Sequence, residues 1–215
     1  MAKPLNGNDL AIVLYNVLPQ HTDAYGKTLP IPSQLKKYGL GIVASLKAAT
    51  VANLLGTITG VAAAGQQLSN GLGTKGKITI TADAMIAITK LKPPVAEYEA
   101  ENKAIIKYIG TGLVEFPVGS ITGKCTNTSS SPGPLTGGAG ARGKITGLTA
   151  KGAVEVVEAA MGSKLGPDME VYYGALVDYI QKTAVVAYAT GKVTGTCPSG
   201  GGPLAAGAAT VGKIT

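Results

Sequence analysis

The chain has 215 residues, of which 45% are hydrophobic, so it has enough apolar surface for a packed core and is not a wholly disordered protein. Only 14% of the residues are charged, and a surface so poor in solubilising charge is often covered by a partner. The net charge of +7 divides into +5 up to Thr79, +2 from there to Thr146 and 0 beyond, but no Lys/Arg run is interleaved with aromatic residues, which argues against specific nucleic-acid binding.

One apolar stretch of short-helix length lies near the start of each third of the chain. Their first residues, Asn8, Thr81 and Thr149, can accept hydrogen bonds from the N–H groups of a first helical turn. A longer stretch with apolar residues every three or four positions follows each of them. We therefore expect a short and a long helix in each third, at 8–18 and 35–49, at 81–91 and 105–116, and at 149–162 and 173–184.

Two segments bear on membrane insertion and export. Residues 48–65 lack charge over a length that could cross a bilayer, but Asn53, Gly56 and Gly60 would interrupt a helix there, so we expect no membrane span. The first twenty residues lack the small-residue cleavage site of a signal peptide, which favours synthesis in a cytoplasm without export.

A glycine-rich phrase closes each third of the chain, at 56–79, 119–146 and 191–215. Each phrase starts with G-x-[IV]-T-G and ends with G-K-I-T, and a leucine stands eight residues before the glycine of that ending. The alternation in TITG and GKIT is typical of half-buried strands, so we expect the two to pair as a short hairpin with a projecting Gly/Ser/Pro/Ala loop. The loops either form a repeated contact device or cover the protein's own helix ends.

These elements predict an α+β fold of three tandem pseudo-repeats, at about 8–79, 81–146 and 149–215, each made of a short helix, a long helix and a Gly-rich β-hairpin loop. A unit of this size buries too little apolar surface to be stable alone. We therefore expect a single triplicated domain over 1–215, in which the repeats share one core with pseudo-threefold symmetry.

The predicted loops supply candidate contact residues rather than a reactive centre. Gly138, Gly143 and Lys144 fit the phosphate-loop spacing, but Ile145 stands where Ser or Thr must hold magnesium. His21 is the only histidine, and no carboxylate pair can be assigned acid/base roles, so we expect no catalytic, metal or cofactor site and no enzyme. The candidate contact-loop residues are Leu68, Lys75, Lys124, Pro134, Leu135, Arg142, Pro203 and Leu204.

The two cysteines occupy corresponding positions of their phrases. Cys125 and Cys197 each stand six residues after the first glycine, where the first phrase has Ala62. They can form a disulfide within the chain, or cross-link subunits, once the protein leaves a reducing cytoplasm. The other interpretation, which we favour, is two reduced cysteines packed as small apolar side chains.

The phrases GSITGKC…PGPL…GKIT and GKVTGTCPSGGGPL…GKIT, about a quarter of the chain, resemble segments of structural proteins of tailed-bacteriophage virions. The resemblance implies an assembly component of the tail, baseplate or neck, located in the virion after synthesis in the host cytoplasm. Its partners would be other virion structural proteins, and low charge with repeated contact loops favours a ring or adaptor built as a homo-oligomer.

Two other classes of function stay open. The chain can be a binding module whose loops hold a host surface, a glycan or DNA, which tyrosine or basic clusters at the loop tips would favour. It can also be an enzyme whose site is assembled from scattered residues that the sequence does not reveal.

Overall fold

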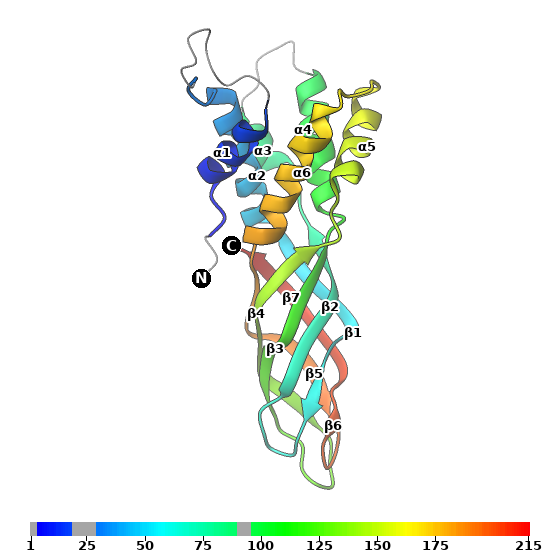
Figure 1. Cartoon of the computed structure of the whole chain (residues 1–215). Coiled ribbons are helices and arrows are strands. Elements are labelled where there is room, and N and C mark those ends of the chain that lie inside the picture. The colour runs from blue at the N-terminus through cyan, green and yellow to red at the C-terminus, as the bar shows by residue number, and fades with distance from the viewer. Residues whose placement is uncertain (1–3, 19–28, 90–95) are drawn as a thin grey trace. The chain divides into compact units, whose positions relative to one another are not determined.

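The computed structural model describes residues 4–18, 29–89 and 96–215, and in these ranges pairs of helices alternate with pairs of long strands (Figure 1). The helices are α1 (Gly7–Val17), α2 (Ser33–Ala48), α3 (Asp83–Thr89), α4 (Ala96–Ile109), α5 (Ala150–Met161) and α6 (Asp168–Thr183). The strands are β1 (Thr50–Ala62), β2 (Ser69–Thr79), β3 (Leu113–Cys125), β4 (Gly133–Thr146), β5 (Val186–Cys197), the two-residue β6 (Gly202–Pro203) and β7 (Ala205–Ile214).

Helices and strands belong to two separate compact units. The helix unit consists of the described residues of Met1–Ala48, Ile80–Thr111 and Gly147–Ala184. The barrel unit consists of Ala49–Thr79, Gly112–Thr146 and Val185–Thr215. In the chain, each pair of long strands follows two helices. The strands nevertheless pack with one another and belong to a different unit from those helices.

The six long strands of the barrel unit close into one antiparallel sheet. Their order is β2-β3-β4-β5-β7-β1, and β1 pairs again with β2. Closure removes the free edges along which unpaired backbone groups would recruit other strands. The short β6 adds to the end of β1 through Val61 and Ala62.

Three strand pairs of the barrel, β1–β2, β3–β4 and β5–β7, carry the same irregularity of register. From Ala52 to Ile58 strand β1 advances six residues, whereas β2 covers only the four from Lys77 to Gly73. The pairs β3–β4 and β5–β7 show the same difference. The extra residues form a bulge in β1, β3 and β5, and its glycine has a positive φ that other residues rarely adopt: Gly56 (78°), Gly119 (78°) and Gly191 (82°).

The barrel interior is filled by aliphatic side chains from all six strands. Neighbouring strands approach closely at glycines, because a Cβ atom on Gly71, Gly138 or Gly207 would overlap a carbonyl oxygen of the next strand. The inner side chains are no more than 7% exposed: Val51, Ile58, Ile78, Val114, Ile121, Ile145, Val186, Val193 and Ile214.

The turns at one end of the barrel are joined by hydrogen bonds. Asn127, in the turn between β3 and β4, is 3% exposed, and its Nδ2 donates to the Pro198 carbonyl at 2.5 Å. Its Oδ1 accepts from the Gly65 N–H at 3.3 Å, and the Gly200 N–H donates to the Thr128 carbonyl at 2.9 Å. One buried amide thus joins the turns that follow β1, β3 and β5.

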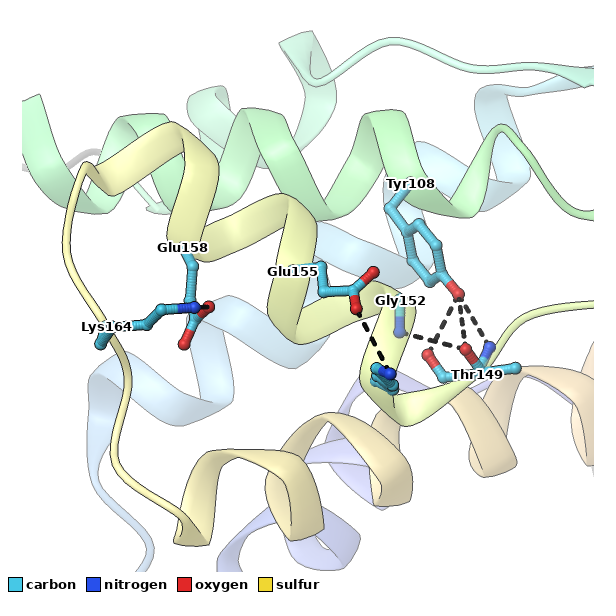
Figure 2. A network of polar contacts seen from close by, with 7 residues as sticks. Tyr108, Thr149, Gly152, Glu155, Glu158 and Lys164 are labelled. Carbon is cyan, nitrogen blue, oxygen red and sulfur yellow. Dashed lines mark hydrogen bonds and ion pairs between the residues drawn. The ribbon is translucent and has the colours of Figure 1, made fainter.

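Side-chain caps stabilise the starts of α1 and α5 in the helix unit. Thr149 caps α5 by accepting from the Gly152 N–H at 3.1 Å, which confirms its predicted role. Figure 2 shows Tyr108 of α4 against this cap, where its hydroxyl accepts from the Thr149 N–H at 2.8 Å. The predicted Asn8 cap is wrong, because Asn6 accepts from the N–H groups of Asn8 and Asp9.

The predicted fold class, three repeats of two helices and a Gly-rich hairpin loop that share one core with pseudo-threefold symmetry, is wrong. The strands close into a barrel with its own interior, and the helices form a different unit. Most of each Gly-rich stretch is strand, and its glycines allow a neighbouring backbone to approach closely. The repeat boundaries at 8–79, 81–146 and 149–215 stay a prediction.

Two local predictions also need correction. GKIT pairs not with TITG but with residues before it, since Val51 faces Ile78 and Val114 faces Ile145. The long helix expected at 105–116 ends at Ile109, and β3 begins at Leu113 with alternating exposed and buried residues. The last two residues of the helix expected at 81–91 lie outside the described residues.

Candidate functional site

The three leucines predicted as contact residues lie inside the barrel unit. They are 6–7% exposed, and each packs against a glycine of the preceding strand, where a Cβ atom would stand 2.8–2.9 Å from the leucine carbons. They are therefore core residues and not loop contacts. The pairs are Leu68 with Gly60, Leu135 with Gly123, and Leu204 with Gly195.

The other predicted contact residues are exposed but lie in strands rather than in projecting loops. Lys75 lies in β2, Lys124 in β3, Pro134 and Arg142 in β4, and Pro203 in β6. They are spread over the barrel and do not converge on one point.

Cys125 and Cys197 form a disulfide within the chain, with their Cα atoms 5.8 Å apart. Both are fully buried at the ends of β3 and β5. The strand between them is β4, whose residues Leu135 and Gly133 face Cys125 and Cys197 in the sheet. The structure therefore joins the two cysteines, where we had favoured a reduced pair.

The bulges of β1 and β3 expose large apolar side chains. Leu54 and Leu55 are 53% and 74% exposed, and Val118 is 62% exposed. The bulge of β5 has the smaller Ala189 and Thr190 at the corresponding positions. Because β2 pairs with both β1 and β3, the two apolar bulges flank one strand. We call Leu54, Leu55, Pro117 and Val118 the contact face.

Side-chain hydroxyls hold both apolar bulges in shape. Thr57 Oγ1 donates to the Leu54 carbonyl at 2.7 Å, and Ser120 Oγ donates to the Pro117 carbonyl at 2.5 Å. The contact face is therefore held by short local hydrogen bonds as well as by the strand pairing on either side.

Two aromatic side chains and one amide side chain lie in the barrel interior next to the bulges. Asn53, Phe116 and Tyr188 each precede a bulge and are 2–3% exposed. The rings of Phe116 and Tyr188 stack at 4.9 Å, and the Tyr188 hydroxyl donates to Asn53 Oδ1. Asn53 Nδ2 in turn donates to the Thr74 carbonyl at 2.7 Å, and burial raises the pKa of Tyr188. These hydrogen bonds connect β5 to β1 and β1 to β2.

Replacing Tyr188 by phenylalanine is expected to lower the free energy of unfolding by about 1–3 kcal/mol, because the buried Asn53 oxygen loses its donor. Urea denaturation measures the change. Tyr98→Phe is the matched control, since Tyr98 is 60% exposed and should change stability by less than about 0.5 kcal/mol. Equal stability of the Tyr188→Phe variant and the wild type would show that this hydrogen bond does not stabilise the barrel.

The helix unit contains a partly buried carboxyl group among tyrosines. The Tyr173 hydroxyl of α6 donates to Glu101 Oε1 of α4 at 2.7 Å, and burial raises the pKa of Glu101. Tyr172 packs edge-on against Tyr173, and its ring lies 6.3 Å from that of Tyr38 in α2. We interpret the group as packing between helices.

Two ion pairs involve carboxylates of α5, and one of these carboxylates, Glu158, is only 15% exposed. Lys164 Nζ lies 2.6 Å from Glu158 Oε2, and this hydrogen bond lowers the pKa of Glu158 (Figure 2). Lys151 and Glu155 form a longer pair at 3.8 Å. The Lys151–Glu155 pair is exposed, and exposed pairs of this kind stabilise a protein little.

Among residues 4–18, 29–89 and 96–215, no three metal-ligating side chains gather, and His21 lies outside these ranges. None of the helices in the same ranges is both long enough and apolar enough to cross a bilayer. Comparison of the chain with protein families, curated proteins and solved structures finds no match.

The contact face was missed at the level of sequence, although a signal exists. In NLLG and FPVG, a buried residue and two apolar residues precede the glycine of the bulge. An isolated glycine inside a strand pattern indicates a bulge, and in these two segments the apolar pair before the glycine is exposed.

Proposed function

We propose that the chain is a structural assembly protein of a phage particle, and that it forms a homo-oligomer through the contact face of the barrel unit. The supporting observation is the exposure of Leu54, Leu55 and Val118, each more than half accessible, on bulges that flank one strand. Soluble monomers seldom expose large apolar side chains together, and such surfaces are commonly covered by another subunit. The resemblance of the Gly-rich phrases to virion proteins supports the choice of a phage particle.

The backbone of the contact face also suits a subunit interface. The hydroxyls of Thr57 and Ser120 donate hydrogen bonds within the bulges, so the bulge backbone is ordered in the absence of a partner. A surface that is already ordered loses less conformational entropy on binding. The proposed contacts thus lie on strand bulges, whereas the Gly-rich segments that we expected to project are paired strands.

The test is the mass of the purified protein by light scattering after size exclusion over a hundredfold range of concentration. The wild type is expected to form a discrete oligomer, and a Leu55→Glu, Val118→Glu variant is expected to be monomeric because charge is costly to bury at an interface. Val171→Glu is the matched control, since Val171 is 56% exposed on α6.

The control variant should keep the mass of the wild type. A wild-type monomer at every concentration would contradict the homo-oligomer and leave a binding module as the better hypothesis. Loss of the oligomer in the Val171→Glu variant as well would show that the contact face is not the specific interface.

A further inference from the structure

Charge is divided between the two units in a way that the order of the sequence hides. The barrel unit contains seven basic side chains and a single carboxylate, a net charge of +6. The remaining sequence contains twelve basic and eleven acidic side chains, a net charge of +1. Nearly all of the protein's net positive charge therefore belongs to the barrel unit.

The basic residues recur at matching positions of the strands. Lys77 of β2, Lys144 of β4 and Lys213 of β7 are the lysines of the three GKIT segments, and Lys75 and Arg142 stand two residues before two of them. Lys192 follows the glycine of the β5 bulge. We call these six residues the basic belt; all are exposed except Lys144, which is half-buried.

The belt extends over neighbouring strands. Lys77 faces Ala52 of β1 and Lys213 faces Thr50 of the same strand, so the two lysines lie on either side of β1. Lys213 also faces Ala187 of β5, the strand that contains Lys192. The one carboxylate of the barrel unit, Glu115, faces Lys144, and the barrel unit has no other to neutralise the remaining lysines.

We propose that the basic belt binds the phosphate backbone of duplex DNA without sequence specificity. Lysines and one arginine on a closed barrel attract phosphates, and release of counterions drives such binding. Both aromatic residues of the barrel unit, Phe116 and Tyr188, are buried, so the unit has no exposed ring on which single-stranded bases could stack. Protein interfaces are enriched in aromatic residues and depleted in lysine, so the belt suits DNA better than an acidic protein.

This inference goes beyond the assembly function and does not depend on it. The belt and the contact face share no residue, although Lys75 lies in the segment of β2 between the two bulges. The two sets of variants change different residues and are read out by different measurements, so each proposal can fail while the other stands.

The experiment measures fluorescence anisotropy of a labelled 30-base-pair duplex of mixed sequence with the full chain. Binding is expected to weaken about a hundredfold or more between 50 and 200 mM salt, as for four or more phosphate contacts. The variant Lys77→Gln, Lys192→Gln, Lys213→Gln is expected to bind at least tenfold more weakly at 50 mM salt. Its salt slope should fall by about 3, one for each lost contact.

The matched control, Lys36→Gln, Lys47→Gln, Lys107→Gln, removes the same charge from exposed sites of the helix unit and should bind DNA as the wild type does. Absence of binding at 50 mM salt, or an equal loss in both triple variants, would overturn the proposal. So would displacement of the DNA by polyglutamate at equal charge concentration, because an acidic protein would then be the better partner. Light scattering of the variant Lys77→Gln, Lys192→Gln, Lys213→Gln, whose contact face is intact, shows whether this variant still self-associates. Weaker DNA binding can then be told apart from a loss of self-association.

Discussion

Replacing Gly138 by alanine is expected to lower the free energy of unfolding of the barrel unit by about 3 kcal/mol. A Cβ atom there would overlap the carbonyl oxygen of Val193, with which Gly138 pairs across β4 and β5. Backbone cannot rotate out of the way as a side chain can, so the two strands must separate and lose hydrogen bonds. Urea denaturation, followed by circular dichroism, measures the change.

Gly166→Ala is the matched control for that substitution. A Cβ atom on Gly166 meets no atom within 4 Å, so this alanine should change stability by less than about 0.5 kcal/mol. If both variants unfold at the same urea concentration as the wild type, strands β4 and β5 do not approach as closely as described. The same test applies to Gly71 and Gly207, whose Cβ atoms would overlap the carbonyl oxygens of Ile121 and Ile58.

Removing the disulfide with a Cys125→Ala, Cys197→Ala variant is expected to lower the free energy of unfolding by about 4 kcal/mol. The two cysteines are 72 residues apart in sequence, so the bond greatly restricts the unfolded chain. Both sulfurs are also buried, and their loss leaves unfilled space near the end of the barrel. Thermal and urea unfolding of the two proteins measure the difference.

Reductant supplies the control for the disulfide. It should lower the melting temperature of the wild type and leave that of the double alanine variant unchanged. Alkylation of both cysteines in unfolded, unreduced protein would contradict the bond. A disulfide-linked dimer on a non-reducing gel would indicate a cross-link between subunits in place of the bond within the chain.

The sequence was a good guide to local structure. Apolar spacing predicted helices near 8–18, 35–49, 149–162 and 173–184, and all four are present with shifted ends. The cap at Thr149 was predicted because a threonine before an apolar helix can accept from the first turn. The helix predicted at 105–116 was wrong over its last part. Leu113 and Phe116 continue the helical spacing of Ile105 and Ile109, but Val114 and Phe116 belong to the buried face of β3.

The candidate site was less accessible from the sequence. The leucines of the Gly-rich phrases were taken for contact residues because the segments around them contain so much glycine, proline and alanine. Their burial depends on Gly60, Gly123 and Gly195 of the paired strands, which leave room for a leucine side chain. Lys77, Lys144 and Lys213 lie far apart in the chain, and only the barrel brings them into one unit.

The sequence by itself determined the approximate positions of four helices and which phrases recur. The tertiary structure alone decided that the strands leave their preceding helices and close on one another, that Cys125 meets Cys197, and that the positive charge gathers in one unit. The physical reason is that periodicity fixes which face of an element must be buried, whereas the element that covers this face is selected by backbone pairing and packing over the whole chain.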